Sequence, residues 1–196
     1  MKYDQIRKIS EDNGGVLLTR AVVDAGISKT YLLKFVRENQ YEKIFNGVYL
    51  APDAWKDHLY LLALRYPGMT FSHQVALYLL GMTDREPCVY TATVPAGYNS
   101  SGQKSEGMRI YTVKREWYHM GGTEVNTVFG HKVKVYSPER TLCDIIRAGT
   151  DIEMQDRQTA LKEYVVRKDR DIPRLMEYAK LFHVDNRIRQ YLEVLL

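Results

Sequence analysis

The sequence lacks the long apolar runs of a membrane protein. Its apolar stretches all fall well short of the ~18 consecutive residues that a membrane span needs. The first residues, Met1 to Asp4, lack the apolar core of a signal peptide. We therefore expect a cytoplasmic protein with no membrane partner.

Cysteine is also scarce. The chain has two cysteines, Cys88 and Cys143, which lie far apart in the sequence and have no CxxC partner. This spacing favours neither a disulfide framework nor a zinc site. The sequence predicts two buried, reduced thiols instead.

Several catalytic motifs are missing as well. The chain has no Asp-x-Lys or Glu-x-Lys triplet, with which restriction-type nucleases hold Mg²⁺ and activate the attacking water. It has no GxxxxGKS/T phosphate loop, no HExxH zinc helix, no GxSxG elbow and no Gly-Ser start of a nucleotidyltransferase site. His73 and His119 have no carboxylate at a catalytic spacing. We therefore expect no enzyme activity, no catalytic residue, no metal site and no cofactor.

Length and charge leave the domain count and the partner open. A chain of 196 residues that is 45% apolar can form one ordinary domain, or a small domain joined to a medium one. A net charge of +4 is compatible with a polyanionic partner but does not require one.

Three short helices are predicted near the N-terminus. Apolar residues at helical spacing predict a first helix over 3–12. Thr19 is expected to cap a short second helix over 20–24, and Ser28 a third helix over 29–38.

A hairpin is predicted directly after the third helix. Two β-prone stretches within residues 40–50 meet at Asn46-Gly47, which is typical of a tight two-residue turn. Three helices followed by a hairpin predict a winged helix-turn-helix, with the hairpin as the wing. We assign this domain to residues 1–52 and expect double-stranded DNA as its partner.

The third helix has one basic face. At about 100° per residue, Thr30, Lys34 and Arg37 fall within an arc of roughly 60°. Such a helix enters the major groove, and the wing lies along the backbone. A solvated helix face carries the same residue types, and winged helices also dock proteins, so both alternatives remain. The expected DNA contacts are Ser28, Lys29, Thr30, Tyr31, Lys34 and Arg37 from the helix and Lys43 and Asn46 from the wing.

The rest of the chain predicts a mixed domain. Residues 53–84 should form linking helices, the second of them capped by Ser72. Residues 85–196 should form a C-terminal mixed α/β domain of about four strands followed by a helical C-terminus, which makes the whole chain α+β. Strands are expected within 88–94, 108–113 and 123–136, a surface loop over 96–107, and helices near 138–148, 152–168, 172–182 and 185–195.

Two groups of residues in this part are singled out. A second phosphate-contacting patch is one interpretation of a basic cluster, and a solvated edge is the other; its members are Lys104, Arg109, Lys114 and Arg115.

Ser137 is a helix N-cap with Pro138 at the first helical position. Arg140 and Asp144, four residues apart, are expected to form an ion pair worth a few tenths of a kcal/mol, in a structural motif.

Three segments together resemble a known family. The wing from Ile44 to Tyr49, the helix start from Phe71 to Leu77 and the segment from Ser137 to Asp144 are similar, in order and spacing, to the AbiEi family. The resemblance implies a winged-helix antitoxin of a type IV toxin-antitoxin system, which acts in abortive infection as a phage defence. It also implies a repressor that binds inverted repeats in its own promoter and neutralises a nucleotidyltransferase-like toxin.

Two other functions remain open on the sequence. One is a plain winged-helix regulator with a ligand-sensing or dimerising C-terminal domain. The other is a nuclease guided by the winged helix. Whether an antitoxin of this kind touches its toxin does not follow from the sequence.

Overall fold

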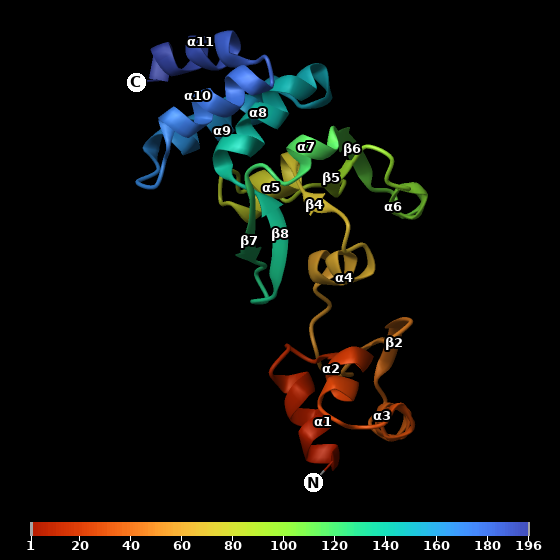
Figure 1. Cartoon of the computed structure of the whole chain (residues 1–196). Coiled ribbons are helices and arrows are strands. Elements are labelled where there is room, and N and C mark those ends of the chain that lie inside the picture. The colour runs from red at the N-terminus through yellow and green to blue at the C-terminus, as the bar shows by residue number, and fades with distance from the viewer. Residues whose placement is uncertain (1, 196) are drawn as a thin grey trace. The chain divides into compact units, whose positions relative to one another are not determined.

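Contacts divide the chain into two units in the computed structural model, which describes residues 2–195 (Figure 1). Unit 1 holds the residues up to Arg65 together with the short segment Asn126–His131. Unit 2 holds Tyr66–Val125 and the residues from Lys132 onward. This division runs through the expected linker 53–84, because its first helix packs in unit 1 and its second in unit 2.

Unit 1 contains four helices and one antiparallel sheet in the part of the chain that is described. The strand order is β1-β3-β2, so β3 is central. The three expected helices and the hairpin at Asn46-Gly47 are present. The elements are α1 (Lys2–Glu11), β1 (Val16–Leu18), α2 (Thr19–Asp24), α3 (Lys29–Glu38), β2 (Glu42–Phe45), β3 (Val48–Leu50) and α4 (His58–Arg65).

The strand β1 was not predicted, and it changes how α2 begins. Leu18 pairs with Val48 of β3 and keeps an extended backbone, so Leu18 and not Thr19 occupies the N-cap position. Thr19 is the first helical residue, and its hydroxyl oxygen is buried without a hydrogen-bond partner. The expectation that Thr19 caps α2 is therefore wrong. Its backbone N–H instead donates to the carbonyl of Gly47 at 2.8 Å.

The apolar faces of these elements form the core of unit 1. Burial of such side chains supplies most of the stability of a small helical unit. Tyr3, Ile9 and Tyr41 pack against this core from its edge. The buried cluster consists of Ile6, Leu17, Val22, Ile27, Leu32, Phe35, Val36 and Tyr49.

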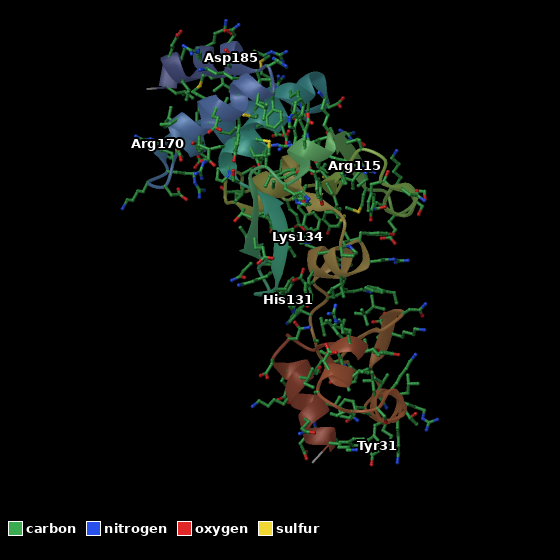
Figure 2. All side chains as sticks on the ribbon, viewed as in Figure 1. Tyr31, Arg115, His131, Lys134, Arg170 and Asp185 are labelled. Atoms are coloured by element: carbon green, nitrogen blue, oxygen red, sulfur yellow. The ribbon has the colours of Figure 1, made fainter. Side chains whose placement is uncertain are left out.

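A buried polar group joins the segment Asn126–His131 to the rest of unit 1. His131 Nδ1 lies 2.7 Å from Asp57 Oδ2, and Thr127 donates its hydroxyl hydrogen to the same carboxylate oxygen. The His131 ring stacks on Tyr60 with 4.1 Å between ring centroids (Figure 2 labels His131). Asp57 and His131 are both buried, so this pairing is the reason that a carboxylate is tolerated inside unit 1.

Unit 2 contains a five-stranded mixed sheet in the order β6-β5-β4-β8-β7. Strand β4 pairs antiparallel with β5 and parallel with β8, and β5 pairs parallel with β6. About four strands were expected; the additional one, β4, has only two residues. The strands are β4 (Thr70–Phe71), β5 (Thr91–Pro95), β6 (Arg109–Val113), β7 (Gly122–Asn126, whose last residue is assigned to unit 1) and β8 (Lys132–Tyr136).

Helices make up the remainder of unit 2. The expected loop over 96–107 contains one of them, α6. The four expected C-terminal helices are present and pack around one apolar core (Figure 1). The elements are α5 (His73–Leu79), α6 (Ser101–Ser105), α7 (Arg115–Tyr118), α8 (Pro138–Ala148), the 3₁₀ turn η1 (Gly149–Asp151), α9 (Met154–Val166), α10 (Ile172–Leu181) and α11 (Asp185–Leu195).

Both cysteines are free thiols, but only one is buried. Cys143 lies in the core of unit 2, and its pKa is raised by desolvation. Cys88 is exposed, so the prediction of two buried thiols is wrong for this residue. Cys88 precedes β5, whose buried part starts only at Thr91.

The helix α8 begins as the sequence predicts. Ser137 is the N-cap residue, and its hydroxyl accepts a hydrogen bond from the backbone N–H of Arg140 at 3.4 Å. Pro138 is the first helical residue. Ser137 also donates to the carboxylate of Glu139 at 3.0 Å, and the other oxygen of that carboxylate accepts from Tyr164 at 3.1 Å.

Arg140 forms a buried network and not a surface ion pair. Its side chain is 0% exposed, and Nε donates to Oδ2 of Asp144 at 2.9 Å. A terminal guanidinium nitrogen donates to the carbonyls of Trp117 and Met120 at 2.8 and 3.1 Å. Burial raises the pKa of Asp144, while the positive charges of Arg140 and Arg147 oppose that shift. The expected value of a few tenths of a kcal/mol applies to solvated pairs, so it is wrong here.

Ser72 occupies the N-cap position of α5, as predicted, but its side chain makes no capping hydrogen bond. Its hydroxyl oxygen accepts a hydrogen bond from Thr93 at 2.8 Å and lies 2.9 Å from His73 Nδ1. His73 is buried, has a positive φ of 53° and stacks on Tyr111 with ring centroids 3.5 Å apart. Its pKa is lowered to about 3, first by desolvation and then by nearby arginine charges.

We expect loss of the Arg140 side chain to destabilise unit 2 strongly. Arg140→Ala removes the main partner of a buried carboxylate, which should lower the free energy of unfolding by about 3–5 kcal/mol. Arg174→Ala, which breaks an exposed pair with Asp171, is the control and should cost less than ~1 kcal/mol. Urea unfolding followed by circular dichroism measures both, and equal losses in the two variants would contradict the prediction.

We also expect a pH dependence that comes from His73. Below pH ~6.5 the unfolded chain binds a proton on this side chain, whereas the folded chain does not until about pH 3. The free energy of unfolding should therefore fall as the pH is lowered through this window, by about 1.4 kcal/mol per pH unit from one proton.

The matched variant is His73→Asn, since asparagine tolerates a positive φ. Its free energy of unfolding, measured in urea at several pH values, should fall less steeply than that of the wild type between pH ~6.5 and ~4. Identical slopes would show that His73 does not titrate as proposed.

Candidate nucleic-acid interface

Helix α3 presents a polar face to solvent. Leu32, Phe35 and Val36 are buried in the core of unit 1, which turns the opposite side outward. Ser28 is the N-cap residue, as predicted, and accepts from the backbone N–H of Tyr31 at 3.4 Å. The exposed residues include Ser28, Lys29, Thr30, Tyr31, Lys34 and Arg37, which are the six that the sequence singled out.

An acidic residue on the same face was missed. Glu38 Oε1 lies 3.8 Å from Lys34 Nζ, and Glu38 Oε2 accepts a hydrogen bond from the hydroxyl of Tyr3 at 2.9 Å. The pKa of Tyr3 is raised by desolvation and by this hydrogen bond. Lys34 is thus partly neutralised, whereas Lys29 and Arg37 have no acidic partner within residues 2–195. The i, i+4 spacing of Lys34 and Glu38 is the sequence signal that indicates the pair.

Tyr31 contacts helix α1 as well as solvent. Its ring meets Tyr3 edge to face with 5.9 Å between centroids, and Lys2 Nζ lies 5.0 Å from the centre of the Tyr31 ring. Figure 2 labels Tyr31 at the edge of this unit. The structure therefore adds a cation from α1, Lys2, to the residues around α3.

The hairpin β2-β3 carries the other two predicted contacts. Lys43 and Asn46 are exposed, and Gly47 completes the turn with a φ of 84°, which an L side chain rarely adopts. A register shift between Lys43 and Phe45 twists β2. Two further cations border this hairpin: Lys56 pairs with Glu42 at 3.7 Å, and the Arg65 guanidinium lies 5.7 Å from the centre of the Phe45 ring.

The second basic cluster is not one patch. Arg109 begins β6 and donates to the carbonyl of Asp151 at 3.3 Å, whereas Lys114 and Arg115 follow the other end of that strand. Five residues of strand span roughly 16 Å. Lys114 lies 3.9 Å from Glu116, Arg115 donates to the carbonyl of Ala96, and Lys104 is on α6. The four cations are thus distributed over separate elements and partners.

The described residues contain neither a metal-binding cluster nor a membrane-spanning helix. No group of three or more His, Cys, Asp or Glu side chains in residues 2–195 is arranged to hold a metal ion. Among the same residues, no helix has the length and apolar character of a membrane span.

Comparison with protein families assigns the N-terminal region. Residues 4–52 match the family model described as a transcriptional regulator, AbiEi antitoxin. This part of unit 1 is therefore similar to an AbiEi-type regulator domain. The match includes the wing, the first of the three segments that resemble the AbiEi family, and confirms the resemblance there. The other two segments, near 71–77 and 137–144, lie beyond the matched residues.

The fold of the chain is similar to that of a solved structure. The chain is similar to the RV2827C protein from Mycobacterium tuberculosis, with a TM-score of 0.58 and 14% sequence identity over 89% of this chain and 69% of that chain. At this identity the likeness shows the fold alone. No curated protein matches the chain.

Proposed function

We propose that the chain is a transcriptional repressor in which unit 1 binds double-stranded operator DNA as a winged helix-turn-helix. The observation that carries this proposal is the exposed stripe of Thr30, Lys34 and Arg37 on α3, next to a hairpin that is anchored to α2. The AbiEi-type match over the same residues supports a DNA-binding regulator.

The mode of binding follows from the geometry of α3. Inserted in the major groove, Arg37 reaches guanine edges or phosphates, and Thr30 contacts either a base or the backbone. Lys43 and Asn46 at the hairpin then lie along the phosphate backbone or in the adjacent minor groove. Two copies bound to an inverted repeat in the chain's own promoter would place α3 of each copy in successive major grooves.

Glu38 orients this interface. Its carboxylate repels phosphates, so the side of α3 that carries Glu38 faces away from the backbone, and the side with Lys29 and Arg37 faces toward it. This arrangement also leaves Tyr3 and Tyr31 at the border of the contact.

We expect Lys34→Glu combined with Arg37→Glu to abolish binding to a promoter fragment in gel-shift assays. The control, Arg174→Glu combined with Lys180→Glu, makes the same charge change on exposed residues of α10 in unit 2. It should leave affinity nearly unchanged. Wild-type affinity should fall steeply with added salt, because phosphate contacts release counterions. Equal loss in both double variants, or unchanged binding by the first, would place the interface elsewhere.

We also propose that unit 2 supplies the antitoxin role, without catalysis, in the cytoplasm. The family that residues 4–52 match is described as an antitoxin, which supports this role for the chain, although the match itself lies in unit 1. The absence of catalysis is supported by unit 2, where Ser137 pairs with Glu139 and Arg140 pairs with Asp144 inside the fold. The proposed target of this role is a nucleotidyltransferase-like toxin of a type IV system active in phage defence. Direct contact between the two proteins is not part of the proposal.

Growth assays separate the two roles. Coexpression of the full chain with its cognate toxin should restore growth, and the Lys34→Glu, Arg37→Glu variant should restore it equally, because the changed residues lie on α3 alone. Repression of a promoter reporter should be lost in the same variant. Failure of the wild-type chain to restore growth would contradict the antitoxin role and leave the repressor role standing.

A further inference from the structure

A groove in the C-terminal helices of unit 2 is the most distinctive feature that the proposed function does not use. It lies between α9 and α11, which pack on each other and on α8 (Figure 1). Its volume is about 490 Å³, within the range of small-molecule sites. The groove is lined by Ile146, Arg157, Gln158, Lys162, Arg187, Gln190, Tyr191, Val194 and Leu195.

The polar lining of the groove is entirely cationic or neutral. Arg157 and Lys162 come from α9 and Arg187 comes from α11, while the lining contains no aspartate or glutamate. None of these three cations forms an ion pair with a described carboxylate. A concave surface of one charge sign concentrates ligands of the opposite sign.

One of the three cations is held in place at the groove, and a second has an unsatisfied nitrogen. Arg187 donates to the carbonyl of Ile146 at 3.1 Å, which fixes its guanidinium against the end of α8. The Nε atom of Arg157 is buried and has no hydrogen-bond acceptor within the described residues. A buried donor left unsatisfied costs roughly 1–3 kcal/mol.

The rest of the lining is apolar. Ile146 is buried, Tyr191 and Leu195 are half-buried, and Val194 is 84% exposed. A ligand that has only charge, such as inorganic phosphate, would leave these apolar side chains exposed to water. The groove thus combines a fixed cationic part with an uncovered apolar part.

We propose that this groove binds a small organic anion with an apolar ring or chain, its acidic head on Arg157 and Lys162 and its apolar part on Tyr191 and Val194. The head receives charge-assisted hydrogen bonds from the terminal guanidinium nitrogens of Arg157 and from Nζ of Lys162. The proposal goes beyond DNA binding and gives unit 2 a ligand-binding role.

Fluorescence titration of the full chain with two dyes tests the proposal. Anilinonaphthalene sulfonate carries an anionic head on an aromatic body, and phenylnaphthylamine is its neutral counterpart. The wild-type chain should bind the anionic dye saturably at one site and at least about tenfold more tightly than the neutral dye, a difference of ~1.4 kcal/mol or more.

Three variants localise that binding. Arg157→Gln combined with Lys162→Gln should weaken the anionic dye by at least about tenfold and leave the neutral dye unchanged. Tyr191→Ala should weaken both dyes. Arg174→Gln combined with Lys180→Gln is the matched control on α10, outside the groove, and should change neither. Circular dichroism verifies that each variant is folded.

The outcomes are distinct. A loss confined to the anionic dye in the α9 variant supports the site. Equal affinity of the wild type for both dyes, no saturable binding of the anionic dye, or an equal loss in the α9 and α10 variants overturns it. Each of these results is independent of the promoter gel shift.

Discussion

The buried guanidinium of Arg140 is the interaction on which unit 2 depends. It lies on α8, yet its partners come from three other places: the carbonyls of Trp117 and Met120 after β6, the Tyr136 ring at the end of β8, and the Phe182 ring after α10. The ring centres of Tyr136 and Phe182 lie 4.4 and 4.3 Å from the guanidinium carbon. One side chain thereby ties the sheet to the helices that follow it.

Removing the Arg140 guanidinium from water costs free energy, which the surrounding groups must offset. A buried cation is tolerated only when its hydrogen bonds and its charge are met within the protein. Asp144 meets the charge and accepts from Nε, the two carbonyls accept from one terminal nitrogen, and the aromatic faces favour a cation between them. The other terminal nitrogen is buried without an acceptor among the described residues. The segment from Ser137 to Asp144 is therefore explained as structure, since its polar side chains are occupied by neighbours inside unit 2.

Local signals in the sequence were sufficient for most helices, but not for the short helices α6 and α7 or for the short strands. Ser28 and Ser137 mark the starts of α3 and α8, because a cap depends on residues only three positions away. Strand β4 has two residues and β1 has three, so neither shows periodicity of its own, and both exist through pairing with distant strands. The failure of Thr19 as a cap follows directly from the pairing of Leu18.

The partner of a polar side chain is hard to predict from the sequence when a residue far along the chain competes with a local one. Ser72 precedes a helix, as a cap would, but Thr93 of the neighbouring strand donates to its hydroxyl. Asp57 also stands before a helix, and its side chain accepts from the backbone N–H of Tyr60 at 3.1 Å. Its other oxygen pairs with His131, 74 residues further along the chain. No spacing rule links positions so far apart, so such pairs are visible only in the folded structure.

The exposed face of α3 was also predicted only in part from the sequence. The helical spacing of Thr30, Lys34 and Arg37 predicts their common face, and the structure exposes all three. The balance of charge on that face depends on Glu38 and on α1, because Tyr3 donates to Glu38 and Lys2 lies over Tyr31. Glu38 partly offsets the charge of Lys34, whereas Arg37 has no carboxylate partner among the described residues. The charge of this face is thus set by an acidic residue as well as by the basic stripe.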